Sequence, residues 1–291
     1  MAEKPPVILT IAGFDPSSGA GITADVKTIA AHGCYGVACI TALTVQSTSG
    51  VRRVEPVDPA LIRATLEELD ADLDIAAVHI GMLGSAKVVK AVSDFLEAAD
   101  KTGNTSSKRR TAHLSNIVLD PILKSSSGAD LLDSAGTRLL IERLIPLADV
   151  ITPNTAEASA LTALRVNDLD TMREAAAKLH QMGAAAVVIT GGDLEKAIDL
   201  LSYRSSKGTQ QEVFKAERQR STSTHGTGCA FATSMACHLG LDRGLAEATL
   251  LSKTYVGAAI ANAQALGKGT GPVHHLYRMT QQRRATSTGG E

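Results

Sequence analysis

Short apolar runs alternate along the chain with longer segments whose apolar residues recur at helical spacing. The short runs are rich in Val, Ile and Ala and end at turn residues, which is typical of buried strands. Such strands are predicted at 7–12, 36–43 and 75–81, followed by three strand-to-loop units at 116–121, 149–154 and 185–192 and an antiparallel pair near 197–216. Helices are predicted at 20–32, 59–73, 85–99, 227–239 and 242–264, and between the later strands. This alternation predicts an α/β fold in which helices cover both faces of a mostly parallel sheet.

The length of 291 residues suits one large α/β domain or two modest ones. No internal repeat or clear linker interrupts the pattern. The polar residues 281–291 predict a disordered tail. The polar and basic stretch 101–113 predicts a solvated surface loop.

Composition narrows the classes of partner. A formal net charge of −1, 3% aromatic residues and no Trp give no sign of nucleic-acid binding. The four cysteines form no CxxC pair and have no zinc-ligand spacing, so we expect reduced thiols in a cytoplasmic protein. The apolar run near the start is too short for a signal peptide, and no run approaches the roughly 20 apolar residues of a membrane helix.

Residues suited to ligand binding gather where the predicted strands end. In parallel α/β sheets, ligands bind beyond the carboxyl ends of the strands. The stretches concerned are 13–15, 44–46, 81–82, 120–121, 153–154 and 190–192. Turn chemistry alone explains any one of them, but together they predict a shared cleft.

The stretch STSTHGTGCAFA, residues 221–232, places two glycines and a cysteine at the start of a predicted helix. A glycine-rich turn that enters a helix directs free N–H groups and the positive end of the helix dipole at one point, which favours an anion such as phosphate. The same field is expected to lower the pKa of Cys229 toward the thiolate. The alternative is an ordinary turn.

Two other stretches offer polar groups. The loop within 12–28 is rich in Gly, Pro and Ser but has neither the P-loop pattern nor the GxGxxG spacing. Asp25 follows it inside the predicted helix, where a solvated first-turn carboxylate is the simplest interpretation. Gln46 lies just past a predicted strand, and its carboxamide can donate to and accept from a heterocycle; a surface Gln is the alternative.

The segment ITPNTAEA puts Asn154 and Glu157 three residues apart. This spacing predicts a helix cap in which the two residues satisfy each other's backbone. It also suits a water-mediated Mg²⁺ site beside a nucleotide, because Mg²⁺ keeps several waters and takes one or two carboxylates. Asp120, at the end of another strand, is the candidate second carboxylate.

An ordered set of motifs carries a family resemblance. The segments are LTIAGFDPSSGAGITADVKT, CYGVACITALTVQST, IGML, VLDPIL, ITPNTAEASAL, VITGGD, THGTGC and GKGTGPVHH, from about residue 7 to residue 277. In this order they resemble the hydroxymethylpyrimidine/phosphomethylpyrimidine kinases of thiamine biosynthesis, which belong to the ribokinase-like superfamily. The resemblance implies a three-layer α/β/α fold in one domain, with ATP as co-substrate and Mg²⁺ as metal.

The resemblance implies two successive reactions. The first phosphorylates the hydroxymethyl group of 4-amino-5-hydroxymethyl-2-methylpyrimidine, and the second converts the monophosphate to the diphosphate. The pyrimidine is then expected near five residues of this chain, which are Gly13, Ala20, Asp25, Gln46 and Met82.

Catalytic roles follow from the same resemblance. The turn Gly226, Thr227, Gly228 and Cys229 is expected to hold the transferring phosphoryl group, with Cys229 as the proton acceptor and Asp25 as an alternative acceptor. Asn154, Glu157 and Asp120 are the expected metal-associated residues.

The nucleotide is expected near Thr190, Gly192, His225 and Lys268. Thr190 is a departure, because many members of the family carry Lys there, and we expect Lys268 to be a source of the missing charge. The loops 14–19 and 121–130 have the composition of mobile covers.

Two other functions stay open at this stage. A pyridoxal or pyridoxine kinase shares the fold and the glycine turn and phosphorylates a hydroxymethyl group on a similar ring. A binding protein that senses the pyrimidine without catalysis is the alternative from another class. The family also suggests a homodimer.

Overall fold

The computed structural model describes residues 4–102, 114–192, 194–195, 197–219 and 221–279. Within them, one nine-stranded sheet has the order β3-β2-β1-β4-β5-β6-β7-β8-β9. The pairings from β2 through β1, β4, β5 and β6 to β7 are parallel, whereas β3, β8 and β9 are antiparallel to their neighbours. The predicted mostly parallel sheet is therefore confirmed.

The elements have the following bounds. The strands are β1 Val7–Phe14, β2 Tyr35–Ser47, β3 Gly50–Pro56, β4 Ile75–Ile80, β5 Ile117–Leu119, β6 Val150–Ile151, β7 Ala186–Gly191, β8 Ala197–Ser205 and β9 Gly208–Ala216. The helices are α1 Gly21–Ala31, α2 Pro59–Asp72, α3 Ala86–Thr102, α4 Ser134–Leu139, α5 Thr155–Thr162, α6 Leu169–Gln181, α7 Thr227–Gly240 and α8 Leu245–Ala261. After α4 the chain continues through a π-helical turn, Leu140–Leu144, and a 3₁₀ turn, Ile145–Leu147.

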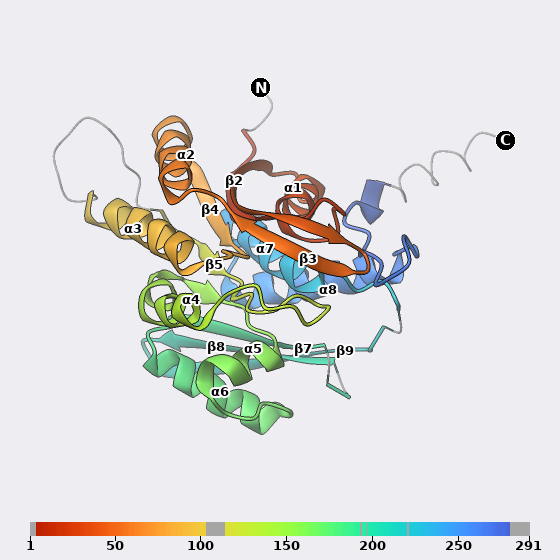
Figure 1. Cartoon of the computed structure of the whole chain (residues 1–291). Coiled ribbons are helices and arrows are strands. Elements are labelled where there is room, and N and C mark those ends of the chain that lie inside the picture. The colour runs from red at the N-terminus through yellow and green to blue at the C-terminus, as the bar shows by residue number, and fades with distance from the viewer. Residues whose placement is uncertain (1–3, 103–113, 193, 196, 220, 280–291) are drawn as a thin grey trace.

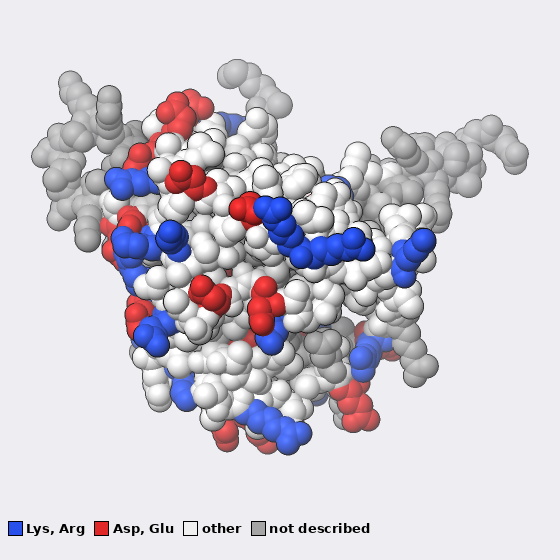
Figure 2. Space-filling view, in the orientation of Figure 1, with Lys and Arg blue, Asp and Glu red and all other residues white. Residues whose placement is uncertain are grey.

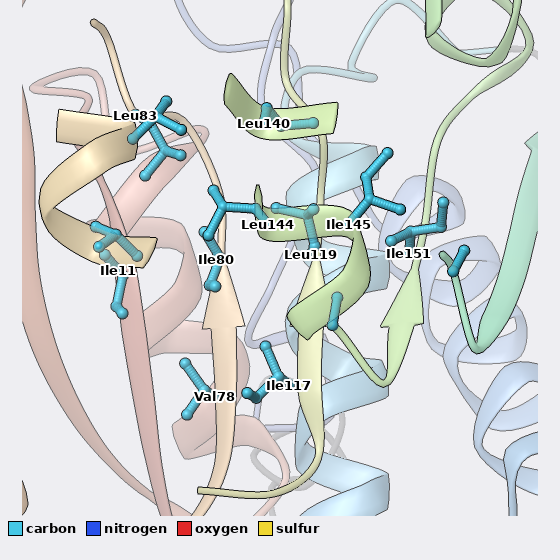
Figure 3. Close-up of a cluster of buried hydrophobic side chains, with 14 of the residues drawn as sticks. Ile11, Val78, Ile80, Leu83, Ile117, Leu119, Leu140, Leu144, Ile145 and Ile151 are labelled. Carbon is cyan, nitrogen blue, oxygen red and sulfur yellow. The ribbon is translucent and has the colours of Figure 1, made fainter. Parts of the chain in front are cut away.

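Helices cover both faces of the sheet, so the three-layer prediction is also confirmed (Figure 1). One apolar cluster joins the sheet to α2, α3 and α6, and another joins it to α1, α7 and α8. In Figure 3, strand residues such as Ile80 and Leu119 meet Leu140 and Leu144 of the layer above them. Burial of such side chains contributes about 1.5–3 kcal/mol each, which holds the strand ends in fixed relative positions.

The largest difference from the predicted elements is at one sheet edge. The predicted strand 36–43 continues to Ser47 and turns back into β3, which the pattern did not predict. Arg52 and Arg53 of β3 are exposed, so this edge strand lacks the apolar run that marks a buried strand. Gln46 therefore lies inside β2 and not beyond it. β5 and β6 form the strand parts of the predicted strand-to-loop units at 116–121 and 149–154.

Charged side chains of both signs are interspersed on the face shown in Figure 2. Among the described residues, no helix is long and apolar enough to cross a membrane. The predicted tail, residues 281–291, and most of the predicted loop at 101–113 lie outside the described residues, whereas positions 101 and 102 belong to α3.

Candidate active site

The glycine turn before α7 has a conformation that excludes other residues. Gly226 has a φ of +83°, and a Cβ there would lie 1.9 Å from the carbonyl oxygen of Gly19. The Thr227 N–H points back to the Thr224 carbonyl at 3.3 Å. Among the described residues no hydrogen-bond acceptor is seen for the N–H groups of Gly226, Gly228 and Cys229. The turn thus presents free donors at a helix N-terminus, as an anion site requires.

Cys229 lies in this turn, in surroundings that favour the neutral thiol. The residue is 8% exposed. Burial raises its pKa well above the ordinary value, and the charges of Asp120, Asp25 and Glu157 raise it further, although the Gly21 N–H opposes them. The expectation that the helix N-terminus lowers this pKa is therefore wrong, because burial and three carboxylates outweigh the helix field.

Of the three carboxylates, Asp120 has the largest effect on this thiol. Asp120 Oδ2 is buried with no hydrogen-bond partner among the described residues, and the neighbouring thiol acts to lower the pKa of Asp120. Burial raises the pKa of Asp120 well above its usual range, and the charges of Glu157 and Asp25 raise it further. A Cβ on Gly228 would lie 3.8 Å from Oδ2, which places this oxygen beside the anion turn.

Asn154 and Glu157 form the predicted cap at the start of α5. The Glu157 N–H donates to Asn154 Oδ1, and the Asn154 N–H donates to Glu157 Oε2, both at 2.9 Å. Burial raises the pKa of Glu157 to about 7, against the hydrogen bonds from Asn154. Thr190 is bridged to Asn154, so the end of β7 adjoins this cap.

These residues fit a divalent cation. Among the described residues no group of three or more His, Cys, Asp or Glu side chains forms a metal cluster. Mg²⁺ does not need one, since it keeps most of its waters and binds one or two carboxylates. The unpartnered Oδ2 of Asp120, together with the charge of Glu157 close by, supplies such a donor set.

Asp25 is fully buried, so its interpretation as a solvated carboxylate is wrong. Its oxygens accept hydrogen bonds from the hydroxyls of Thr10 (2.8 Å) and Thr233 (2.9 Å), and His79 Nδ1 lies 3.4 Å away. These partners come from β1, α7 and β4, which the sequence alone did not connect. The charge of Asp25 still reaches Cys229 and Asp120, as their pKa values show.

Of the five predicted pyrimidine residues, Ala20 and Asp25 lie at the start of α1, and the other three lie in or just after β1, β2 and β4. A Cβ on Gly13 would lie 3.0 Å from the sulfur of Met82, which is buried with Ala42 and Leu131. Gln46 Oε1 lies 3.1 Å from the Thr44 hydroxyl. Ala20 precedes α1. Met82 thus packs in an apolar cluster next to Gly13, and Gln46 lies further along β2 beside Thr44 and His225; the contact of either residue with a pyrimidine stays a prediction.

The His225 side chain contacts polar groups from three other segments of the chain. Its Nε2 lies 2.8 Å from Asp15 Oδ2 and 3.4 Å from Gln46 Nε2, and its Nδ1 lies 3.3 Å from the Ser126 hydroxyl. Asp15 was not assigned a role from the sequence. The signal available was the DPSS segment, since an Asp that opens a turn often binds the N–H two residues on, as Asp15 does with Ser17 at 2.8 Å.

The predicted nucleotide residues lie on different parts of the fold: Lys268 belongs to a segment that packs against Thr48, whereas Thr190 lies beside Asn154. Thr190 is the second-last residue of β7, which ends at Gly191, and Gly192 is exposed directly after the strand. Lys268 is exposed in a segment whose Gly271 carbonyl accepts from the His225 N–H at 3.0 Å. The structure thus places Lys268 on the segment that supports the anion turn.

A parallel α/β sheet with a glycine anion turn and buried carboxylates at its strand ends defines a phosphoryl-transfer enzyme that acts on a small molecule. The phosphomethylpyrimidine kinase family model matches residues 15–274. The chain therefore belongs to the phosphomethylpyrimidine kinase family, and it is a kinase.

Individual relatives agree with this assignment. The chain is 38% identical over 270 residues to the hydroxymethylpyrimidine/phosphomethylpyrimidine kinase of Haemophilus influenzae, covering 92% of this chain and 96% of that protein. It is 40% identical over 271 residues to the thiamine biosynthesis bifunctional protein ThiED of Geobacter sulfurreducens. That match covers 92% of this chain and 52% of the Geobacter protein, so the chain spans about half of it.

A solved structure of Bacillus subtilis pyridoxal kinase in complex with ADP is also similar, with 32% identity, a TM-score of 0.81, and coverage of 95% of this chain and 100% of that chain. The ribokinase-like fold is thereby confirmed. The fold is common to both kinds of kinase, whereas the family model and the two curated relatives favour the pyrimidine kinase over the pyridoxal kinase.

Proposed function

We propose that this enzyme transfers the γ-phosphoryl group of ATP first to the hydroxymethyl group of 4-amino-5-hydroxymethyl-2-methylpyrimidine and then to the resulting monophosphate, in one domain over 1–280. The observation that carries this proposal is the meeting of Cys229, Asp120 and the free N–H groups of the glycine turn. An alcohol placed there would have a proton acceptor on one side and phosphate donors on the other.

Mg²⁺ is proposed at Asp120 and Glu157. A cation there would stabilise negative charge on the transferring phosphoryl group. Both carboxylates also raise the pKa of Cys229 in this structure. A cation that neutralised them would favour the thiolate by removing their part of the rise in this pKa, while the part due to burial would remain.

The ring is proposed to lie between Met82 and Gln46. The Met82 sulfur packs against the ring face, and the Gln46 carboxamide meets the amino group and the adjacent ring nitrogen.

Lys268 is proposed to contact the nucleotide phosphates in place of the Lys that the family carries at Thr190. Replacement of Lys268 by Ala should then raise KM for ATP and leave KM for the pyrimidine unchanged.

A homodimer is proposed through the outer edge of the sheet. Ile40, Leu43 and Val45 of β2 are 36%, 50% and 56% exposed. Arg53 and Glu55, which lie opposite Val45 and Leu43 on β3, add charges of both signs to this surface. A two-fold axis can pair such a surface with a second copy of itself.

The free thiols of all four cysteines suit the cytoplasm.

The test is turnover of two alcohols with ATP and Mg²⁺, the aminopyrimidine in one series and pyridoxal in the other, followed by mass analysis. We expect kcat/KM for the aminopyrimidine to exceed that for pyridoxal by at least about 100-fold, since buried polar groups reject ligands that leave them unpaired. A preference for pyridoxal would replace this function with that of a pyridoxal kinase. Binding of the aminopyrimidine without any transfer would indicate a sensor.

A further inference from the structure

A chain of polar contacts connects the first loop to the residue proposed to read the ring. Asp15 Oδ1 accepts from the Ser17 N–H and hydroxyl at 2.8 and 2.7 Å. Asp15 Oδ2 accepts from the Ala20 N–H at 3.0 Å and faces His225 Nε2 at 2.8 Å. The side chains of Asp15 and His225 are only 5% and 11% exposed, so water competes little for this contact.

Asp15 determines which atoms in this series of polar contacts carry a proton. Burial raises its pKa, but the hydrogen bonds from His225 and Ser17 prevail and hold the pKa below the ordinary value. An ionised carboxylate only accepts hydrogen bonds, so His225 Nε2 must carry a proton. His225 Nδ1, 3.3 Å from the Ser126 hydroxyl, is then able to accept from it.

This proton has a consequence for Gln46. Gln46 Nε2 lies 3.4 Å from His225 Nε2, where two N–H donors now face each other. At the other end, the single Thr44 hydroxyl proton faces two acceptors, Gln46 Oε1 at 3.1 Å and the Phe14 carbonyl at 3.0 Å. A half-turn of the carboxamide removes both mismatches: the one Nε2–H of His225, which donates mainly to Asp15 Oδ2 at 2.8 Å, gains Gln46 Oε1 as a second and longer acceptor, and Gln46 Nε2 donates to Thr44.

We propose that Asp15, through the protonated Nε2 of His225, fixes the carboxamide of Gln46 with Oε1 toward His225, and that this pair is a specificity-determining device of the enzyme. In that orientation Gln46 keeps one free N–H and one free oxygen lone pair, side by side. An aminopyrimidine edge offers the complementary ring nitrogen and amino N–H. A ring without the amino group leaves the oxygen unpaired. The inference rests on the proposed function, because it takes Gln46 as the residue that contacts the ring.

The test compares two ligands in four proteins. The ligands are the aminopyrimidine alcohol and the same alcohol without its amino group, and the proteins are wild type, D15N, H225Q and S17A. In D15N the carboxamide can donate to His225 Nε2, so the tautomer is no longer fixed. We expect D15N to raise KM for the aminopyrimidine at least about tenfold with kcat nearly unchanged, as expected for one mispaired buried group. KM for the alcohol without the amino group should change by less than about threefold.

Two matched variants separate this role from loop stability. H225Q keeps an N–H donor near the Nε2 position and should retain most of the discrimination. S17A removes a partner of the other Asp15 oxygen and leaves the His225 contact in place, so the ratio of the two KM values should stay that of wild type. A spectroscopic readout is independent of turnover: the ¹⁵N shifts of His225 should show the Nε2–H tautomer in wild type and a mixture in D15N.

The outcomes are distinct. If D15N raises KM equally for both ligands, or leaves the ratio of the two KM values unchanged, the inference is overturned and the kinase assignment stays in place. If wild type neither binds nor phosphorylates the aminopyrimidine, the proposed function fails. In that case the tautomer comparison still decides whether Asp15 controls His225, and an unchanged tautomer in D15N would overturn that part also.

Discussion

The charge of the Asp120 carboxylate raises the pKa of the Cys229 thiol, and the thiol acts to lower the pKa of Asp120. The proposed proton acceptor and a proposed metal ligand therefore influence each other's charge. A cation that binds Asp120 would offset the negative charge that adds to the effect of burial on Cys229. In this account, the binding of the metal is linked to the formation of the Cys229 thiolate, which is proposed to accept the proton of the substrate hydroxyl.

Alkylation of Cys229 by iodoacetamide should depend on Mg²⁺. Because only the thiolate reacts, we expect a slow rate at pH 8 that rises severalfold with millimolar Mg²⁺. Peptide mass analysis measures it, with Cys39 as internal control, since burial alone raises that pKa to about 11. D120N should react faster without metal and respond less to Mg²⁺. A Cys229 rate that ignores both changes would contradict the linkage.

Gly226 should tolerate no side chain. G226A places a methyl group 1.9 Å from the Gly19 carbonyl at a φ of +83°, so the loop or the turn must move. We expect a loss of more than about 2 kcal/mol in unfolding free energy and of activity by at least about 100-fold. G33A is the matched control: its φ is +74° but no atom lies within 4 Å of the added Cβ. It should lose about 1 kcal/mol and keep its activity. Urea unfolding and kcat measure both.

How far the sequence predicts this site is shown by particular residues. The anion turn, the Asn154–Glu157 cap and the strand ends follow from local rules on glycine, helix starts and parallel sheets. The pKa of Cys229 does not, because it depends on Asp120, which comes from a strand more than 100 residues earlier.

Asp25 and β3 illustrate the same limit. The burial of Asp25 requires Thr10, Thr233 and His79 to arrive from three elements, and nothing in the helix pattern around Asp25 indicates them. β3 is a half-exposed edge strand without an apolar pattern. It is recognised as a strand only by its pairing with β2, which the sequence does not show.

Glu157 should weaken the fold at alkaline pH. Its folded pKa of about 7 is above the ordinary 4.5, so the native state binds the proton more tightly than the unfolded chain. The unfavourable contribution is absent below pH 4.5, grows as the pH rises, and is complete above pH 7. E157Q keeps an oxygen for the Asn154 N–H and should be about 1–3 kcal/mol more stable at pH 8, with no gain at pH 4.5. Its kinase activity should nevertheless fall sharply. Urea titrations at both pH values measure the stability, and a gain of equal size at the two would show that charge is not the cause.

His238 should contribute to acid sensitivity. It is buried, neither ring nitrogen has a partner among the described residues, and its pKa is lowered to about 4 by burial and by the charges of His32, Arg243 and Arg278. Between pH 6.5 and 4 the unfolded chain takes up a proton that the native state refuses, so stability falls as the pH falls through this window. Between pH 8 and pH 5, the free energy of unfolding of H238F should fall by about 1–2 kcal/mol less than that of wild type. Parallel stability profiles for the two proteins would rule out this contribution.

The second phosphorylation tests the account most directly, because it requires one anion turn to serve both an alcohol and a phosphate acceptor. Purified enzyme would be incubated with ATP, Mg²⁺ and the pyrimidine monophosphate as the only acceptor, and the products followed by mass. The account predicts the pyrimidine diphosphate with one ADP per product, and its loss in D120N. Phosphorylation of the alcohol with no diphosphate from the monophosphate would contradict the proposal that this one site carries out both transfers.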